Sequence, residues 1–400
     1  MYVIIWGFLG MSSTRLRKGA FTMRVLLISH SYIHRSARLK LNLLSKFPDV
    51  ELTALVPECW AFRLEGFVEA GEEYRMPYHF RPLPTINRDN EQRYLLRRMG
   101  KVIKEFRPEI VHCENGPGAY VCFQANLLKK IFVPHAKSIV FSWKNLSYNI
   151  RRPWNWMIEQ FNLRQTDCFI AGNEDAVRVH RERGYKGRFE VLPLWGIEPD
   201  FGRNVDPEDV RSVRTSLDLG SFVVGFLGRF VRAKGILTLI EAISKIQNEL
   251  SILLVGRGPL KSEILELATQ LGMIDRIRFV DTVPYDEVPL YLNCMDVMVL
   301  PSLTTPAWKE QFGHVLIEAI SCKVPVIGSS SGEIPNVIGD AGLIFREGNA
   351  DDLAEKVRMV MGDKRLRDEL ARRGRQRVLE KYTHRKIVEE TYKVYQELLT

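Results

Sequence analysis

Short apolar runs alternate with amphipathic helical stretches along the chain from Met23 onward. Continuous apolar runs bounded by turn residues are typical of strands buried on both faces, as in parallel sheets covered by helices. The runs predict strands at 24–29, 51–56, 109–114, 138–143, 168–173, 189–194, 222–227, 251–255, 276–280, 297–300 and 324–327. The stretches between them predict helices at 37–47, 91–106, 118–131, 155–165, 174–183, 236–246, 260–271 and 314–321, with a helical tail at 351–361, 365–381 and 384–399. The pattern indicates an α/β protein whose sheets are doubly wound.

A stretch rich in glycine, proline and acidic residues, 196–207, interrupts the alternation. A chain of 400 residues exceeds the usual size of one core, so we interpret this stretch as a hinge between two Rossmann-like domains, 23–195 and 208–383. Ligands of such sheets bind beyond the carboxyl ends of the strands, which would face each other across a cleft. Residues 1–22 are either a disordered or membrane-touching extension or, as we favour, an over-extended start upstream of Met23.

The net charge of +9 favours a polyanionic partner: a nucleic acid, an anionic membrane or a phosphorylated substrate. Six scattered cysteines without a C-x-x-C pair indicate buried thiols in a reducing compartment such as the cytoplasm. The sequence contains neither Asp-x-Asp nor a His/Cys cluster at metal spacing, so we expect no metal and no cofactor.

The stretch 310–328 combines a loop, a helix and a buried strand around Gly313. The first N–H groups of a helix have no partner inside it and lie at its positive end, where a phosphate can bind. Glu310 precedes this turn and Glu318 follows it, so the two carboxylates bracket an anion site and could accept hydrogen bonds from sugar and ribose hydroxyls. The alternative is that both glutamates are solvated residues without such a role.

A second strand end carries a basic loop that begins at Gly228. This glycine lets the backbone approach a ligand closely, and Arg229 and Lys234 offer cations for the charge that develops on a departing diphosphate. Two further strand exits contain Gly256 and Val283, and the backbone near Val283 could bind a nucleobase edge. A solvated basic loop is the alternative, but two anion-binding strand ends together favour a nucleotide-sugar site.

Together these motifs resemble the C-terminal half of family-four glycosyltransferases (glycosyl transferases group 1). The matching segments are Gly228-Arg229…Lys234-Gly235, Gly256-x-Gly258-Pro259, Pro301-Ser302…Glu310-x-Phe312-Gly313…Glu318-Ala319, Pro325-Val326-Ile327, Gly332-Glu333-Ile334-Pro335 and Gly339-Asp340-Ala341-Gly342-Leu343. The resemblance implies a GT-B fold in which helix 384–399 returns to the first domain. It also implies retaining, metal-independent transfer from a nucleoside-diphosphate sugar, in polysaccharide or glycolipid assembly.

The resemblance gives each matching residue an expected role. Arg229 and Lys234 would hold the diphosphate, Glu318 the ribose and Glu310 the sugar hydroxyls. The backbone from Gly313 through His314 to Val315 would hold the distal phosphate.

The first half matches the family less closely, and it would bind the acceptor, a sugar or a lipid-linked sugar. Glu114 stands where the family has the second histidine of a His-x-His strand end, and its carboxylate could orient an acceptor hydroxyl or face the anomeric carbon. A solvated or helix-capping glutamate is the alternative. His30, His34 and Lys144 lie beyond other strand ends and are further acceptor candidates.

The basic amphipathic helix expected at 91–106, with Lys129-Lys130 and Arg151-Arg152-Pro153-Trp154, indicates either docking on the anionic cytoplasmic face of a membrane or a solvated surface. Competing functions are a sugar-nucleotide epimerase, a phosphorylase and a nucleic-acid-binding protein. A phosphorylase needs a pyridoxal lysine, which nothing marks. The chain lacks a zinc finger, a heptad zipper and an RNP-like strand, so we do not expect nucleic acid as a partner.

Overall fold

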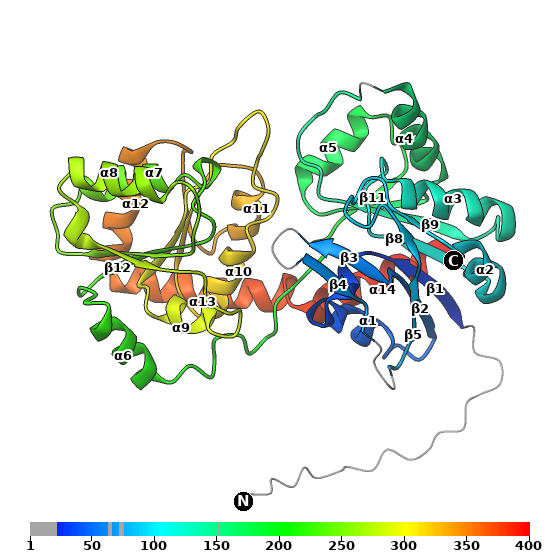
Figure 1. Ribbon diagram of the computed structural model, residues 1–400. Coiled ribbons are helices and arrows are strands. Elements are labelled where there is room, and N and C mark those ends of the chain that lie inside the picture. The colour runs from blue at the N-terminus through cyan, green and yellow to red at the C-terminus, as the bar shows by residue number, and fades with distance from the viewer. Residues whose placement is uncertain (1–21, 63–65, 72–75, 151) are drawn as a thin grey trace, which may run out of the picture.

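The computed structural model describes residues 22–62, 66–71, 76–150 and 152–400, and it contains two parallel sheets with helices on both faces of each (Figure 1). The α/β architecture with two doubly wound domains is therefore confirmed. The predicted extension 1–22 lies outside the described residues except for Thr22.

The first sheet has seven parallel strands in the order β11-β10-β9-β8-β1-β2-β5. In that order they are Arg188–Val191, Cys168–Ala171, Lys137–Ser142, Ile110–Cys113, Met23–Ile28, Val50–Pro57 and His79–Leu83. The sheet is covered by α1 (Leu39–Leu44), α2 (Met99–Phe106), α3 (Tyr120–Phe132), α4 (Pro153–Gln165) and α5 (Glu174–Glu182). Strand β5 and the hairpin of β3 (Cys59–Phe62) and β4 (Gly66–Glu69) were not predicted, because their apolar runs are at most four residues long and most of their residues are half-buried or exposed.

The helix predicted at 91–106 is wrong in its first half, because α2 begins only at Met99. Leu95 and Leu96 form strand β7 (Leu95–Leu96), which pairs with β6 (Thr85–Ile86). Arg98 has a left-handed backbone conformation, with φ of 65°, just before the helix. The tertiary pairing of β6 with β7 therefore overrides the helical periodicity.

The second sheet has six parallel strands in the order β14-β13-β12-β15-β16-β17. In that order they are Ile277–Val280, Ser251–Val255, Val223–Leu227, Val297–Leu300, Val326–Ser329 and Leu343–Phe345. Its helices are α7 (Ile236–Ser244), α8 (Lys261–Gln270), α10 (His314–Ser321), α12 (Ala350–Gly362) and α13 (Lys364–Lys381), together with the short α9 (Val288–Asn293) and α11 (Ile334–Ile338). Helix α6 (Pro207–Ser216), which was not predicted, precedes this sheet along the chain.

The chain crosses between the two sheets twice, and the crossings lie side by side. Ile197 in the predicted hinge forms a β-bridge with Thr383, and a Cβ on Gly196 would lie only 2.5 Å from the backbone nitrogen of His384. Helix α14 (His384–Leu399) then packs against the first domain, as the red helix in Figure 1 shows. Its buried Tyr395 hydroxyl lies 2.7 Å from Nδ1 of His112 in β8. In the described part of the chain, every helix is too short or too polar to cross a bilayer.

Candidate functional site

A cavity of about 490 Å³ lies at the carboxyl ends of β12, β13 and β14. Gly228, Arg229, Gly256 and Val283 all line it, so the structure brings four of the predicted donor-site residues together. Thr282, Gly258 and Val288 complete much of its wall. A flat nucleobase and its ribose suit a cavity that is bordered by backbone at three strand ends.

The glycines at this edge are required by close backbone approach. A Cβ on Gly256 would lie 2.1 Å from the carbonyl oxygen of Gly228, and a Cβ on Gly258 would lie 2.3 Å from that of Phe230. Both contacts are shorter than a side chain can tolerate, so the two loops can pack together only with glycine at these positions. This packing holds the loop of Arg229 against the cavity.

Helix α10 starts directly after Gly313, which lies against Leu300 at the carboxyl end of β15, the strand beside β12. This glycine has a φ of 81°, the left-handed conformation that other residues rarely adopt, and it caps the helix without a side-chain bond. The N–H groups of the first turn, at His314 and Val315, are left for a ligand. Burial lowers the pKa of His314 to about 4, so its imidazole is neutral at pH 7 and adds no charge to this anion site.

Lys234 and Glu310 form an ion pair at the site, with Nζ and Oε2 2.6 Å apart. The hydroxyl of Ser302 donates to the same oxygen of Glu310 at 2.8 Å. Gly235, next to Lys234, lets its loop lie close to the loop of Ser302, because a Cβ at position 235 would lie 1.8 Å from the carbonyl oxygen of Pro301. Arg229 is exposed and makes no ion pair with any residue that the structure describes, so its guanidinium is available to an anionic ligand.

Glu318 lies further along α10 and is paired with a residue that sequence reasoning missed. Burial raises its pKa to about 7, and a hydrogen bond with the Tyr285 hydroxyl partly opposes that rise. Tyr285 is 61% exposed and its ring lies 5.5 Å from that of Phe201 in the hinge. Hydroxyl groups that donate hydrogen bonds to this carboxylate would favour its ionised form.

The loop before α10 contacts the first domain, a feature that sequence reasoning also missed. The amide of Asn145, after β9, donates to the carbonyl oxygens of Lys309 and Glu310 at 3.1 and 3.0 Å. The amide of Asn173, after β10, donates to that of Gln311 at 3.1 Å, and Lys309 pairs with Asp175 at 2.5 Å. Asn145 follows the strand predicted at 138–143 and Asn173 is the last residue of the one predicted at 168–173, so their position at strand ends was the available signal. The loop before α10, residues 301–313, is called the donor loop below, and it is thus held by contacts with the first domain.

Glu114 differs from its predicted role. Its side chain is buried, and its Oε1 lies 2.6 Å from Nζ of the equally buried Lys40. A carboxylate that is buried and paired with a lysine is not exposed to an acceptor hydroxyl or an anomeric carbon in this arrangement. Glu114 is therefore an internal ion-pair partner in the first domain.

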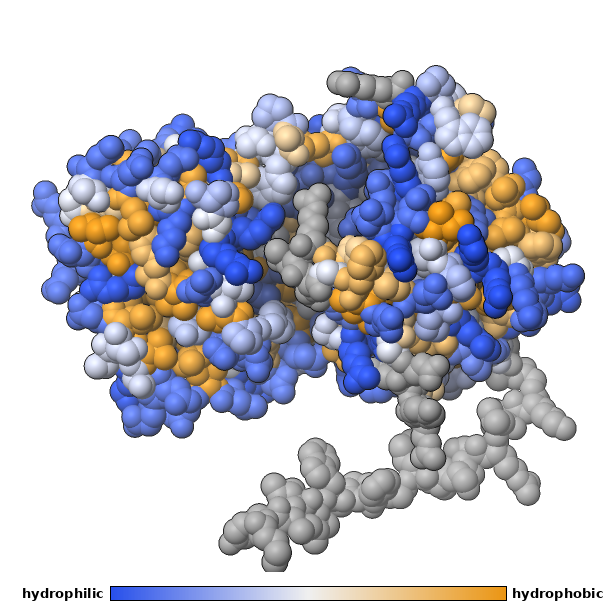
Figure 2. Space-filling view, viewed as in Figure 1, coloured by the Kyte–Doolittle hydropathy of each residue, from blue (hydrophilic) through white to orange (hydrophobic). Residues whose placement is uncertain are grey.

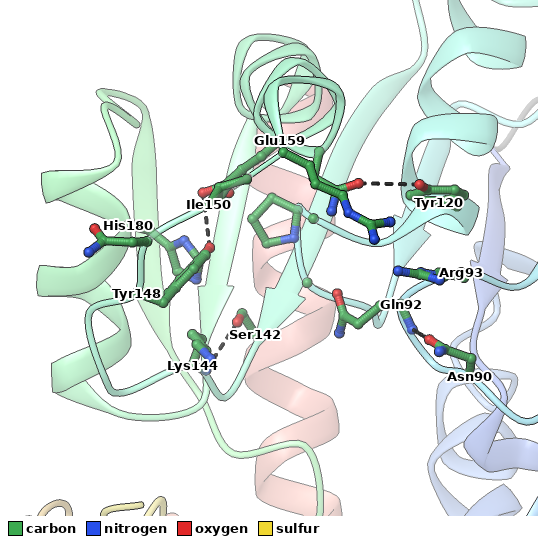
Figure 3. Close-up of a pocket in the computed structure, with 16 residues that line it drawn as sticks. Asn90, Gln92, Arg93, Tyr120, Ser142, Lys144, Tyr148, Ile150, Glu159 and His180 are labelled. Atoms are coloured by element: carbon green, nitrogen blue, oxygen red, sulfur yellow. Dashed lines mark hydrogen bonds between the residues drawn. The ribbon is translucent and has the colours of Figure 1, made fainter. Parts of the chain in front are cut away.

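The three acceptor candidates do not lie together. His30 packs on Trp60 with ring centroids 4.8 Å apart and lies 3.6 Å from Glu91, and His34 packs on Phe62 at 4.2 Å. Lys144 instead lines a separate cavity of about 750 Å³ at the carboxyl ends of β8 and β9 (Figure 3). Among the residues that the structure describes, no three His, Cys, Asp or Glu side chains are grouped so that they could hold a metal ion.

Two family models match the chain: Glycosyltransferase Family 4 over residues 58–196 and Glycosyl transferases group 1 over residues 210–377. The chain is 34% identical over 177 residues to N-acetyl-alpha-D-glucosaminyl L-malate synthase of Bacillus anthracis, which covers 43% of this chain and 45% of that protein. It is 27% identical over 261 residues to the lipopolysaccharide core biosynthesis glycosyltransferase LpsE of Rhizobium meliloti, covering 64% of this chain and 72% of the relative. The chain thus spans about half the length of the first of these relatives.

Solved structures of similar fold cover nearly the whole chain. Anabaena Alr3699/HepE in complex with UDP superposes with a TM-score of 0.72 at 17% identity, over 94% of this chain and all of that one (100%). A glycosyltransferase from Rickettsia africae superposes with a TM-score of 0.70 at 17% identity, over 95% and 99% of the two chains. At this identity the likeness concerns the fold.

Proposed function

Since the two matched models together span most of both domains, the chain belongs to the family-four glycosyltransferases of the GT-B fold, and we propose that it transfers a sugar from a nucleoside-diphosphate sugar to a hydroxyl acceptor in polysaccharide or glycolipid assembly. The observation that carries this proposal is the meeting of Arg229, Lys234 and the start of α10 at one edge of the second sheet. HepE, which has the same fold, is described in complex with UDP, and this supports a nucleotide in the cavity at Gly228 and Gly256.

The residue roles follow from the geometry and the family resemblance. Arg229 and Lys234 bind the diphosphate and stabilise the charge that grows as it departs, and the N–H groups of His314 and Val315 bind the distal phosphate. Glu318 accepts from the ribose, and Glu310 accepts from the transferred sugar. Fixed cations at the diphosphate support transfer without a divalent ion. We infer retention of the anomeric configuration from the family resemblance alone.

The decisive experiment is release of nucleoside diphosphate from a panel of UDP, GDP and ADP sugars in the presence of EDTA. We expect slow release by the unmodified chain and none by Lys234→Ala or Glu318→Ala. Loss of activity on chelation would contradict the metal-free mechanism, and an inverted product anomer in proton NMR would contradict retention. Interconversion of donors without any acceptor would instead indicate an epimerase.

We further propose that the first domain docks on an anionic membrane surface through α2 and the end of α3. Ile131, Phe132 and Leu127 are 59%, 37% and 37% exposed there, and Figure 2 shows apolar surface over α3 at the outer edge of this domain. Lys101, Lys104 and Lys130 are exposed on the same two helices. Apolar side chains bordered by lysines suit the headgroup region of an anionic bilayer.

Two residues of the expected basic surface do not contribute to this proposal. Lys129 is buried and donates to the carbonyl oxygen of Ala136, so it takes no part. Arg151, of the expected basic cluster, lies outside the described residues.

A further inference from the structure

The cavity of about 750 Å³ in the first domain has a wall of uncompensated positive charge. Arg93, Lys144 and Arg152 line it, all three are exposed, and none forms an ion pair with another described residue. The acidic side chain in the same wall, Glu159, is neutralised by Arg183, whose guanidinium donates to it at 2.9 and 3.2 Å. The cavity therefore carries net positive charge, and its volume suits a sugar-sized ligand.

His180 gives a second, independent sign of a ligand. Its side chain is fully buried at the wall of the cavity, and neither ring nitrogen has a hydrogen-bond partner among the described residues. Burial lowers the pKa of His180 to about 3, so the ring is neutral and can both donate and accept. Buried polar groups in proteins are normally paired, and an unpaired one at a cavity wall indicates a ligand or a bound water.

The remaining wall offers partners for hydroxyl groups. Figure 3 shows Gln92 and Arg93 on one side of the cavity and Lys144 and Tyr148 on the opposite side. Side-chain amides and hydroxyls also line the cavity, at Asn90, Asn149, Asn155, Ser142 and Tyr120. Amides and hydroxyls can donate to and accept from a sugar, whereas arginine and lysine bind anionic oxygens. The cavity thus has separate partners for both kinds of group.

The loop after β9, which contains Lys144, connects this cavity with the donor site. Lys144 lies between Trp143, whose ring centroid is 6.1 Å from that of Phe312, and Asn145, whose amide donates to the carbonyl oxygen of Glu310. A ligand held by Lys144 is therefore bound by the segment that contacts the donor loop. Resting on the proposed glycosyl transfer, we infer that this cavity binds the acceptor, and that the acceptor carries a phosphate or carboxylate group recognised by Arg93, Lys144 and Arg152.

The experiment measures binding of glucose 6-phosphate and of glucose to the full chain saturated with UDP, which blocks the diphosphate site. We expect glucose 6-phosphate to bind and glucose to bind at least about tenfold more weakly, since each lost charged hydrogen bond weakens binding by roughly that factor. Lys144→Met and Arg152→Met should each weaken glucose 6-phosphate binding by about tenfold. Lys186→Met removes an exposed cation of the same domain that does not line the cavity, and it should change nothing.

Equal binding of glucose and glucose 6-phosphate, or equal effects of Lys144→Met and Lys186→Met, would overturn the inference. Arg229→Met separates it from the proposed function, because that variant should weaken UDP binding and leave glucose 6-phosphate binding unchanged. If UDP fails to bind while the sugar phosphate binds, the donor assignment fails and the anion site stands.

Malate tests carboxylate recognition in the same assay. Vesicles of phosphatidylcholine with phosphatidic acid test the source: displacement of glucose 6-phosphate supports a lipid-borne anion, and no displacement supports a soluble one.

Discussion

The Nζ atom of Lys234 lies 2.6 Å from Oε2 of Glu310, although both side chains are assigned to different parts of the same substrate. Without a donor, each neutralises the other, and an unpaired charge would be costly because Glu310 is buried and Lys234 is half-buried. A diphosphate that binds Lys234 must therefore compete with Glu310. This competition leaves the carboxylate free for sugar hydroxyls only when the nucleotide is in place.

The two residues should consequently respond differently to substitution. Lys234→Ala should weaken nucleotide diphosphate binding and lower turnover by about 100-fold or more, because a cation is lost where charge develops. Glu310→Gln should lower turnover while leaving nucleotide affinity equal or tighter, because Lys234 no longer has a competing carboxylate. Calorimetric titration and release of nucleoside diphosphate measure the two quantities. Lys245→Ala, which breaks a surface pair with Asp351, is the control and should alter neither. Equal loss of nucleotide affinity in both site variants would contradict the competition.

The donor site could be predicted largely because it is built from local features. Each of its parts is a strand end or a helix start, most of them marked by glycine in the sequence, and Gly228, Arg229, Gly256 and Val283, which were predicted for one site, do line one cavity. Backbone geometry at a parallel sheet edge repeats between proteins, and short-range sequence therefore carries it.

The acceptor side depends on contacts between distant segments, which the sequence does not mark. Glu114 is neutralised by Lys40, which lies 74 positions away, and nothing around either residue signals the pair. Likewise Leu95 and Leu96 leave the predicted helix because they pair with Thr85–Ile86. The interdomain bonds of Asn145 depend on how the domains meet, which local periodicity cannot give.

Glu318 should make nucleotide-sugar binding depend on pH. Its pKa is raised to about 7 by burial, and ribose hydroxyls bind best to the ionised form. We expect affinity to rise as the pH increases from about 6 to about 8, by at most about tenfold per pH unit for one proton. A nucleotide sugar is the suitable probe because both its phosphates are esterified and do not titrate near neutrality. In Glu318→Gln the dependence should vanish, and its persistence would assign it to another group.

The same residue should affect stability with the opposite sign. Its folded pKa lies above that of an unfolded glutamate, about 4.3, so both states are protonated at low pH and no stability is lost there. As the pH rises through about 7, the unfolded state ionises first and the folded state loses relative stability. Denaturant unfolding of Glu318→Gln and the unmodified chain should therefore show the variant gaining relative stability between about pH 4 and about pH 8. A constant difference across this range would show that Glu318 is not buried as a neutral acid.

We expect Tyr395 to stabilise the packing of helix α14 against the first domain. Its hydroxyl is the partner of Nδ1 of His112, and both residues are fully buried. Tyr395→Phe leaves that nitrogen unpaired and should lower the free energy of unfolding by about 1–3 kcal/mol. Tyr392→Phe, one turn earlier on the same helix, removes bonds to the half-exposed Asp49 and should cost less than about 1 kcal/mol, because water can replace them. Similar losses of unfolding free energy in the two variants would show that the buried hydrogen bond stabilises the fold no more than the half-exposed ones do.

Membrane docking through the end of α3 predicts that surface charge and apolar surface act together. Ile131→Ser removes a 59% exposed side chain and should weaken co-sedimentation with phosphatidylglycerol vesicles without affecting stability, since little of it is buried. Lys130→Glu should weaken it further and increase its sensitivity to salt, because each lysine near an anionic surface contributes about 1 kcal/mol. Met359→Ser, 42% exposed on α12 of the other domain, is the matched control. If Met359→Ser weakens binding as much as Ile131→Ser does, the contact is non-specific. If neutral phosphatidylcholine vesicles bind as well as anionic ones, the lysines have no role and the docking surface must be sought elsewhere.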